Sequence, residues 1–403
     1  MELRPILSAM FRNKTGAILV GLQIAITLAV VANAVFIIMQ RAEKIGRPPG
    51  IDSDNLIFVQ SYGYGPNYNH RETVRRDLDL MRSLPGVVAA SALFGIPMSG
   101  GGAQSNYGLV PDPDKANIVA NYYEMDEQGV AALGVKLLSG RAFTEQEVQF
   151  NPNRNHSDFV PSVIVTQDLG RAFFGDESPL GKTIYDGYGR ASAQVVGVID
   201  NMIGSWVDFD DPSRVIFVPR ISSGPVARYA VRAEPGRRDA LIAEIERKLA
   251  AEDISRAITS VRPHTYFVRN SYRADTRMVA YLSVIAALMV AITALGIVGL
   301  ASFHVNVRTK QIGTRRAVGA RKVDIIRYFM LENWVLTTGG VIAGAIMAFA
   351  FGHWLSAAYA LPRLQPIYVA AGIVLLWILG QLAVFVPARR AAAIPPAIAT
   401  RTV

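Results

Sequence analysis

The stretch from Met278 to Phe303, MVAYLSVIAALMVAITALGIVGLASF, is apolar along almost its whole length. A helix needs about 20 such residues to cross a bilayer. Three further stretches also reach spanning length: Ala17–Met39, Trp334–Trp354 and Ile367–Val386. The chain of 403 residues contains 51% hydrophobic residues and has a mean hydropathy of +0.26. This composition and these four stretches predict a membrane protein.

The first apolar stretch could instead be a secretory signal. Arg4, Arg12 and Lys14 precede it, and Ala32-Asn33-Ala34 resembles a cleavage site. The apolar run nevertheless continues to Met39, which is longer than the ~7–15 residues of a signal's apolar region. We therefore expect an uncleaved membrane anchor.

Charged residues are distributed unevenly around the four stretches. Residues 41–277 contain 27 Lys or Arg and 29 Asp or Glu, whereas the rest of the chain contains 14 and 3. The basic excess lies at the N-terminus, in residues 308–327 and in the C-terminal tail. Because basic loops stay in the cytoplasm, these three segments and both termini are expected there. The large segment between the first two spans is then extracytoplasmic.

The predicted fold is an α-helical membrane protein with four transmembrane helices and a large extracytoplasmic α/β (α+β) domain inserted between helices 1 and 2. Its expected parts are a cytoplasmic N-terminal segment (1–16), helix 1 (17–40), the outer domain (41–275), helix 2 (276–304), a cytoplasmic coupling segment (305–332), helix 3 (333–356), helix 4 (366–387) and a cytoplasmic tail (388–403).

The outer segment predicts a mixture of strands and helices. Runs of β-branched and aromatic residues predict strands at 55–60, 162–165, 193–199, 214–218 and 229–232. Apolar residues at helical spacing predict helices at 71–84 and 238–251, and loops are expected at Ser99–Gly102 and at 151–157. This alternation indicates two interleaved α/β lobes. With no cysteine, the domain contains no disulfide.

One stretch of the outer segment, FGDESPLGKT (Phe174–Thr183), looks like a phosphate-binding loop. Such a loop has four residues between its first glycine and the Gly-Lys pair, but five separate Gly175 from Gly181. Pro179 also lacks a backbone N–H that could bind phosphate. Together with its extracytoplasmic position, this argues against ATP hydrolysis by this chain.

No catalytic or metal-binding pattern is present in the sequence. The five histidines are scattered without metal-ligand spacing, and there is no Gly-x-Ser-x-Gly motif and no cysteine nucleophile. The spans contain no paired ionisable residues, so an intramembrane enzyme is the least favoured class. The pI of 9.7 does not indicate nucleic-acid binding, because the basic residues follow the membrane topology.

The cytoplasmic segment Arg308–Asn333 reads RTKQIGTRRAVGARKVDIIRYFMLEN. One interpretation is a loop of solvated charges. Alternatively, Ile312 and Ala317 lie on one side of a short helix and Gly319-Ala320 forms a sharp turn into the next helix. Such a helix could act as a lever for a cytoplasmic partner. The candidate coupling residues are Arg308, Gln311, Ile312, Gly313, Arg315, Arg316, Ala317, Gly319 and Ala320, and the arginines are expected to be displayed away from the apolar side.

This segment resembles the one shared by FtsX-like permeases of the MacB family, usually Arg-x-Arg-Glu-Ile-Gly-x-Arg-Arg-Ala-x-Gly-Ala with a Glu several residues into the next helix. LGVKLLSGRAFTEQE (133–147), FFGDESPLGKTI (173–184) and VVGVID (195–200) resemble the MacB-type periplasmic core. PARRAAAIPPAIATR (387–401) resembles the family's ending. The resemblance covers nearly the whole chain.

The resemblance implies that FGDESPLGKT is a structural turn. It also implies a dimer that works with a pair of separate ATPase subunits, because MacB carries its ATPase domain on the same chain and this sequence contains none. ATP and Mg²⁺ would then bind to the ATPase, and no cofactor to this chain. Closure of the ATPases would push the short helix, the first two spans would act as stalks, and the outer domain would expel or transfer a periplasmic antibiotic, peptide or lipid.

Further partners follow from the same resemblance. The resemblance implies a periplasmic membrane-fusion adaptor and an outer-membrane channel as partners. The basic segment Met1–Lys14 is expected to lie on the lipids of the inner leaflet. Gln311 stands where the family usually has Glu, so we hypothesise a heterodimer whose other half keeps the Glu. Two alternatives stay open: an FtsX-like scaffold for envelope signalling, and a membrane-anchored sensor.

Two pairs of glycines occur within the spans. Gly340 and Gly344 form Gly-x-x-x-Gly in the third span, and Gly296 and Gly299 lie in the second. They are interpreted either as close helix packing at a dimer seam or as the ordinary glycine content of membrane helices. Asn33, in the first span, is expected to contact protein rather than lipid.

Overall fold

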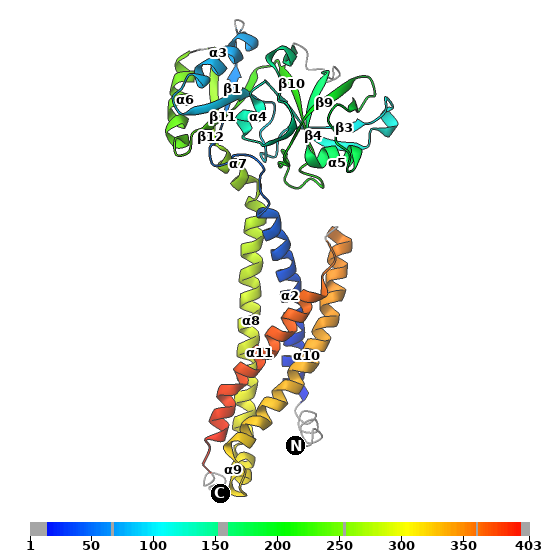
Figure 1. Cartoon of the computed structure of the whole chain (residues 1–403). Helices are drawn as coiled ribbons and strands as arrows, with labels where there is room; N and C mark the ends of the chain where they lie inside the picture. Colours follow the sequence, from blue (N-terminus) through cyan, green and yellow to red (C-terminus); the bar gives the residue numbers. More distant parts are fainter. Residues whose placement is uncertain (1–13, 66–67, 152–159, 253–254, 360–361, 396–403) are drawn as a thin grey trace. The chain divides into compact units, whose positions relative to one another are not determined.

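The computed structural model describes residues 14–65, 68–151, 160–252, 255–359 and 362–395. The chain forms two compact units, one of Met1–Gly46 with Asp275–Val403 and one of Arg47–Ala274 (Figure 1). We call them the helical unit and the outer unit. The loop expected at 151–157 lies, except for its first residue, outside the described residues.

The helical unit contains four helices that are long and apolar enough to cross a membrane. They are α2 (Lys14–Ile45), α8 (Arg273–Val307), α10 (Lys322–Tyr359) and α11 (Pro366–Ala392). A short helix, α9 (Thr309–Ala317), lies between α8 and α10. The predicted fold class, four spans with an α/β domain between the first and second, is confirmed.

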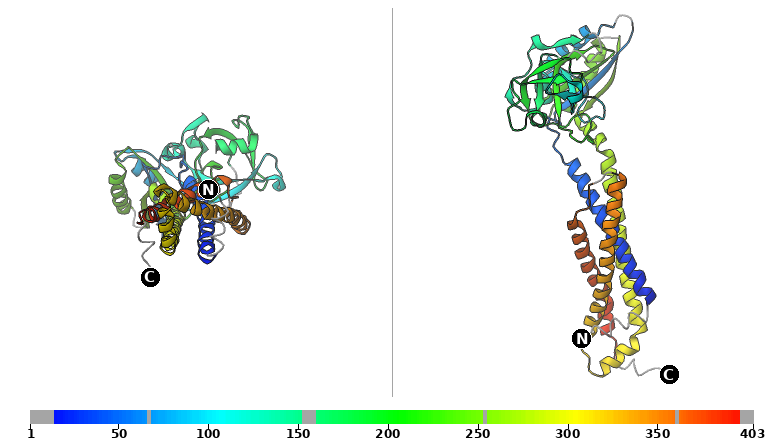
Figure 2. Two further views of the ribbon diagram at one scale, coloured as in Figure 1. Left: turned by 90° about the horizontal axis from the view of Figure 1, so that it is seen from below. Right: turned by 90° about the vertical axis from the view of Figure 1, so that its right-hand side faces the viewer.

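Helix α10 packs along α2 and α11 (Figure 2). A Cβ atom at Gly340 would lie 2.9 Å from Ile24 Cβ, and one at Gly344 would lie 2.9 Å from the Ala25 carbonyl oxygen. Helix α2 of the same chain therefore fills the Gly-x-x-x-Gly groove. The close packing of these two glycines is thus with α2 of the same chain, and their role at a dimer seam stays a prediction.

The other two candidate glycines, both on α8, differ from each other. A Cβ at Gly296 would meet Gln23 Oε1 of α2 at 2.4 Å, whereas one at Gly299 would meet nothing within 4 Å. Only Gly296 thus takes part in close packing with α2.

Polar side chains also join the helices. Asn33 Nδ2 donates to the Ala348 carbonyl of α10 at 3.1 Å, which confirms that this amide contacts protein. On the other side of α2, the hydroxyls of Thr27 and Thr293 are 2.7 Å apart. Since lipid offers no hydrogen-bond partner, such groups hold helices together only when they are satisfied by protein.

The first lobe of the outer unit is a four-stranded antiparallel sheet in the order β12-β1-β11-β2. Its strands are β1 (Leu56–Gly63), β2 (Val87–Ala92), β11 (Val226–Ala233) and β12 (Arg256–Pro263). Helices α3 (His70–Arg82) and α6 (Arg238–Glu252) contribute Leu78, Met81 and Ile245 to the core on one face of the sheet. A third helix, α7 (His264–Ser271), contributes Phe267 to the core on the other face.

The second lobe is an eight-stranded mixed sheet in the order β4-β3-β8-β9-β7-β10-β6, with β5 paired to β9. An additional pairing of β10 with β4 closes it into a ring. Helix α5 (Gln167–Phe174) packs on this lobe, whereas α4 (Gly129–Leu133) contacts β2 and β11 of the first sheet. The strands are β3 (Ala103–Gly108), β4 (Ile118–Met125), β5 (Leu137–Gly140), β6 (Gln149–Asn151), β7 (Ser162–Thr166), β8 (Thr183–Asp186), β9 (Ser192–Ile199) and β10 (Val215–Ser222).

The two predicted lobes are therefore present, but they are nested rather than interleaved. Strands β3 to β10 all belong to the second lobe, which is inserted as one block between β2 and β11 of the first. All five predicted strands and both predicted helices occur in the structure, and Ser99–Gly102 lies outside regular elements as expected.

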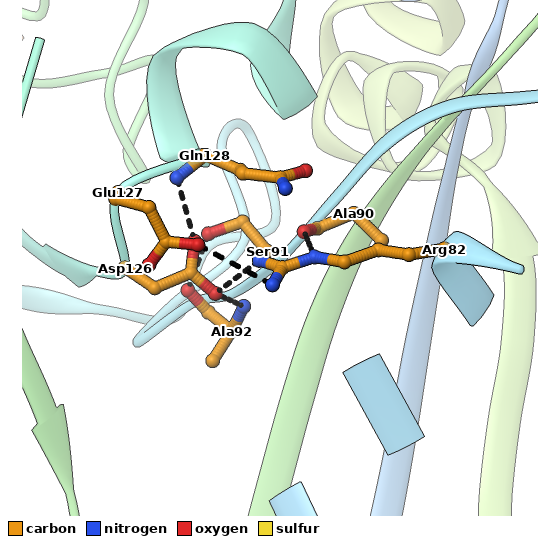
Figure 3. A network of polar contacts seen from close by, with 7 residues as sticks. All are labelled: Arg82, Ala90, Ser91, Ala92, Asp126, Glu127 and Gln128. Atoms are coloured by element: carbon orange, nitrogen blue, oxygen red, sulfur yellow. Dashed lines mark hydrogen bonds and ion pairs between the residues drawn. The ribbon is translucent and has the colours of Figure 1, made fainter. Parts of the chain in front are cut away.

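A buried carboxylate joins the two lobes (Figure 3). Asp126, directly after β4, accepts hydrogen bonds from the backbone N–H groups of Ala92 and Gln128 at 3.0 and 2.9 Å. Arg82, at the end of α3, donates to Asp126 Oδ2 at 3.1 Å and to the Ala90 carbonyl at 2.9 Å. Burial of the carboxyl raises the pKa of Asp126 to about 6.

The stretch FGDESPLGKT forms the turn between α5 and β8. Gly175 ends the helix, and Gly181 has φ of +76°. The backbone N–H groups of Glu177, Gly181 and Lys182 donate to carbonyls of Phe174, Val195 and Pro179. These amides are already used, so the stretch is a structural turn and not a phosphate cradle.

Candidate coupling site

Helix α9 lies at one end of the helical unit, where the chain turns from α8 into α10 (Figure 1). It ends in a tight turn in which the N–H of Gly319 donates to Arg316 O and that of Ala320 to Arg315 O. Gly319 adopts φ of +103°, a conformation that glycine accepts without a Cβ penalty. The expected sharp turn at Gly319-Ala320 is therefore present.

One side of α9 is buried against the long helices. Ile312 is 5% exposed and belongs to a core with Val305, Phe329 and Ala391, from α8, α10 and α11. Burying an isoleucine side chain contributes about 1.5–3 kcal/mol. Gly313 is buried beside it, whereas Ala317 is exposed. The prediction that Ala317 shares the apolar side is wrong, because the neighbouring helices cover the 312–313 side only.

A carboxylate from α10 fixes the start of α9. Glu332 Oε2 accepts from Arg308 Nη1 at 2.9 Å, and Glu332 Oε1 lies 3.5 Å from His304 Nδ1, near the end of α8. Arg308 also reaches the Tyr328 hydroxyl at 3.3 Å. The Glu332 side chain is 7% exposed and that of Arg308 16%, so removing either partner would leave a buried charge, at a cost of about 3–5 kcal/mol.

An arginine fixes the other end of α9 to α11. Arg316 Nη1 donates to the carbonyl oxygens of Ala392 and Ile394 at 2.9 and 3.0 Å. The last carbonyls of a helix have no partner within that helix, so a cation there satisfies them. Arg308 and Arg316 thus bind within the chain, which corrects the expectation that they are displayed outward.

The opposite side of α9 is exposed and carries Lys310, Gln311, Thr314 and Arg315. Val318, next to the helix end, is 84% exposed. The Arg315 guanidinium lies over the Tyr328 ring, 5.1 Å from its centroid. A groove between α9 and α10 is lined by Thr314, Arg315, Val318, Ala320, Asp324, Ile325 and Tyr328. This combination of cationic and apolar groups can bind another protein.

The candidate coupling residues thus divide into two groups. Arg308, Ile312, Gly313 and Arg316 hold α9 in place, with Ala320 half-buried beside them. Gln311, Arg315, Ala317 and Gly319 are exposed, and among the described residues no hydrogen bond is formed by the Gln311 side chain.

Glu332 was not among the predicted site residues. The sequence does contain an indication of its role. Glu332 is a carboxylate at the start of an apolar span, and a carboxylate in that position requires a nearby cation.

No group of three or more histidines, cysteines or carboxylates that could hold a metal occurs in the described part of the chain. His264, for example, is a structural residue of the outer unit. Its Nδ1 lies 2.9 Å from Ser53 Oγ and its Nε2 lies 3.1 Å from the Pro97 carbonyl oxygen. Burial lowers the pKa of His264 to about 4, so the ring is neutral at pH 7.

Two regions of the chain match known protein families. Residues 23–261 match the MacB-like periplasmic core domain, and residues 283–396 match the FtsX-like permease C-terminal region. The macrolide export ATP-binding/permease protein MacB of Acinetobacter baylyi is 22% identical over 95% of this chain and 55% of that protein. The pyoverdine export ATP-binding/permease protein PvdT of Pseudomonas entomophila is 28% identical over 58% of this chain and 36% of that protein.

The crystal structure of the periplasmic region of MacB from Actinobacillus actinomycetemcomitans has 16% identity and a TM-score of 0.35, covering 57% of this chain and 97% of that one. The chain spans 55% or less of the length of the two export proteins named above. The two family matches together cover both the outer unit and most of the helical unit. The chain therefore belongs to the MacB family of FtsX-like ABC transporter permeases, as a multipass inner-membrane protein with a periplasmic core domain.

Proposed function

We propose that this chain is a permease subunit that converts ATP hydrolysis by a separate cytoplasmic ABC ATPase into motion of its periplasmic core domain. This motion exports or transfers a periplasmic substrate such as an antibiotic, a peptide or a lipid. One observation carries the proposal: α9 is fixed through Arg308 and Arg316 to the long helices, while its cationic and apolar outer side is exposed.

Helix α8 provides the mechanical link. It runs without interruption from Arg273 to Val307, and 35 residues at about 1.5 Å each give a rod of about 50 Å. Asp275, at its outer end, accepts hydrogen bonds from Arg41 Nη1 and Lys44 Nζ of α2 at 2.6 and 2.8 Å. A push on α9 would therefore move α8 and α2 together.

The proposed partners follow from the family. A dimer of ABC ATPases binds ATP and Mg²⁺ on the cytoplasmic side, where both termini of this chain lie, and this chain binds no cofactor. The second permease is another copy or, as Gln311 indicates, a paralogue that keeps Glu at this position. A membrane-fusion adaptor and an outer-membrane channel would complete an export complex.

The test is purification of the tagged chain from its native membranes in mild detergent, with mass spectrometry and an ATPase assay of what accompanies it. A stoichiometric ATPase is expected. The double variant Arg315→Glu/Val318→Asp should lose it, because both substitutions lie on the exposed side of α9. The control Arg247→Glu, at an exposed arginine of α6, should keep it.

Two outcomes would contradict the proposal. One is a wild-type preparation repeatedly free of any ATPase under conditions that preserve a known complex. This would favour the scaffold or the sensor. The other is full retention of the ATPase by the double variant, which would show that the partner binds elsewhere.

A further inference from the structure

A cavity of about 540 Å³ lies in the outer unit. Gln60 of β1 and Val226 and Arg228 of β11 line it on one side. The loop from Phe94 to Gly102 and Phe267 of α7 line it on the other. Its volume falls within the roughly 300–1,000 Å³ typical of sites for small organic molecules.

The cavity contains a half-buried arginine without a counter-ion. Arg228 Nε donates to Gln60 Oε1 at 3.1 Å, and among the described residues no carboxylate pairs with its guanidinium. Glu124, which lines a small neighbouring pocket together with Arg228, is paired instead with Arg220 at 2.9 Å. Burial lowers the pKa of Arg228, and no neighbouring carboxylate counteracts this effect. A partly desolvated cation is costly unless an anion joins it.

The loop that forms the opposite wall is held in a fixed and strained shape. Met98 has φ of +55° and is the one non-glycine residue with positive φ in the described part of the chain. Its N–H donates to the Gly204 carbonyl at 2.9 Å, and His264 Nε2 donates to the Pro97 carbonyl at 3.1 Å. Strain of this kind, imposed by surrounding contacts, is typical of preorganised binding sites.

We propose that this cavity binds an organic anion with an apolar body. The anionic group, a sulfonate, carboxylate or phosphate, would accept hydrogen bonds from the Arg228 Nη atoms. The apolar body would lie against Phe94, Ile96 and Phe267. The site itself depends only on the outer unit, and its role in holding a compound for export rests on the function proposed above.

The test uses two fluorescent probes of equal shape, dansyl sulfonate, which is an anion, and dansylamide, which is neutral. Binding is measured by equilibrium dialysis on the full chain in nanodiscs. We expect saturable binding of the sulfonate and weaker binding of the amide. Arg228→Gln should weaken sulfonate binding by about 10- to 100-fold, because a hydrogen bond to a charged group is lost. Arg228→Lys should restore part of it, and the exposed control Arg247→Gln should change nothing.

A second variant keeps the proposal testable if Arg228→Gln fails to fold, which thermal unfolding would reveal. A Cβ at Gly101 meets only Ser99 Oγ, at 4.0 Å, so Gly101→Leu can occupy part of the cavity without moving the backbone. Gly101→Leu should weaken sulfonate binding although the positive charge of Arg228 is retained. Equal binding of sulfonate and amide, or sulfonate binding that survives both variants, would overturn the proposal.

These outcomes are independent of the transport proposal. The binding assay needs neither ATP nor an ATPase, whereas the co-purification needs no ligand. A chain that binds the sulfonate through Arg228 but recruits no ATPase would keep the site and remove the transport role. A chain that recruits the ATPase but binds no sulfonate would support the transport role and remove the proposed anion site.

Discussion

Both units use a buried carboxylate to join distant segments, but the partners of the two carboxylates differ. Glu332, in the helical unit, accepts a hydrogen bond from the side chain of Arg308 and lies 3.5 Å from His304 Nδ1. Asp126, in the outer unit, is bound by Arg82 and also by two backbone N–H groups. Helices leave almost no backbone N–H free in their interior, so helix joints depend on side chains, whereas strand ends offer free amides.

We expect the largest loss of stability from substitution of Glu332. Glu332→Leu should destabilise the helical unit by about 3–5 kcal/mol, because Arg308 is left buried without a partner. Thermal unfolding of the detergent-solubilised chain measures this loss. In the double variant Arg308→Met/Glu332→Leu the loss should be smaller than in the single variant. The exposed Arg327→Met serves as the control. Equal losses in single and double variants would mean that the ion pair is not the joint.

Asp126 should show its effect as a pH dependence. Its folded pKa of about 6 is above the value of about 3.9 expected when unfolded. The carboxyl thus contributes stability that is present below about pH 4 and lost as the pH rises through about 6. Two pKa units correspond to about 3 kcal/mol.

The matched variant is Asp126→Asn, which stays neutral at every pH. Between pH 4 and pH 7, the unfolding free energy of the wild type should fall relative to that of the variant. Pulse proteolysis of the outer unit across a urea gradient measures this difference, with the exposed Asp210→Asn as the control. Parallel curves for wild type and Asp126→Asn would show that burial does not penalise this charge.

The helices α2 and α10 are joined in a third way, by close contact between their backbones. Gly344→Leu should destabilise the helical unit by about 1–3 kcal/mol, since even a Cβ there lies 2.9 Å from the Ala25 carbonyl oxygen. Gly299→Leu is the matched control, because a Cβ there meets nothing within 4 Å. Thermal unfolding of both variants compares them directly, and equal effects would refute the packing role of Gly344.

The smallest effect is expected at the exposed side of α9. Gln311→Glu should change the ATP hydrolysis rate of the reconstituted complex by less than about fivefold, because an exposed ion pair contributes only about 0.2–1 kcal/mol. Complete loss of coupled activity would count against a heterodimer whose other half carries the Glu.

The features that were predictable from the sequence are those determined by nearby residues. Span length and hydropathy predicted the four long helices, and dense β-branched runs predicted β7 and β9. Strand β3, with the sequence AQSNYG, has no such pattern and is a strand because β4 and β8 pair with it. The nesting of the lobes depends on pairings between distant strands, which no local pattern encodes.

The candidate site was predictable to a similar degree. The motif located α9 and its terminal turn, since glycine and helix propensities act locally. The inward roles of Arg308 and Arg316 depend on Glu332 and on the carbonyls of Ala392 and Ile394. Those partners lie in α10 and at the end of α11 or just after it, far away in the sequence. The expectation that all these arginines point outward was therefore wrong for Arg308 and Arg316.

The nested lobes also determine an order of folding. Leu56 of β1 pairs with Arg232 of β11, and Ile57 with Pro263 of β12. When β1 emerges during synthesis, both of its partner strands are still to be made, and long-range pairings of this kind form slowly. All strands of the second lobe, in contrast, are present once β10 has been synthesised. Pairing of β10 with β4 can then close the ring. We expect the second lobe to fold first and to bring β2 and β11 together, so that the first sheet forms last.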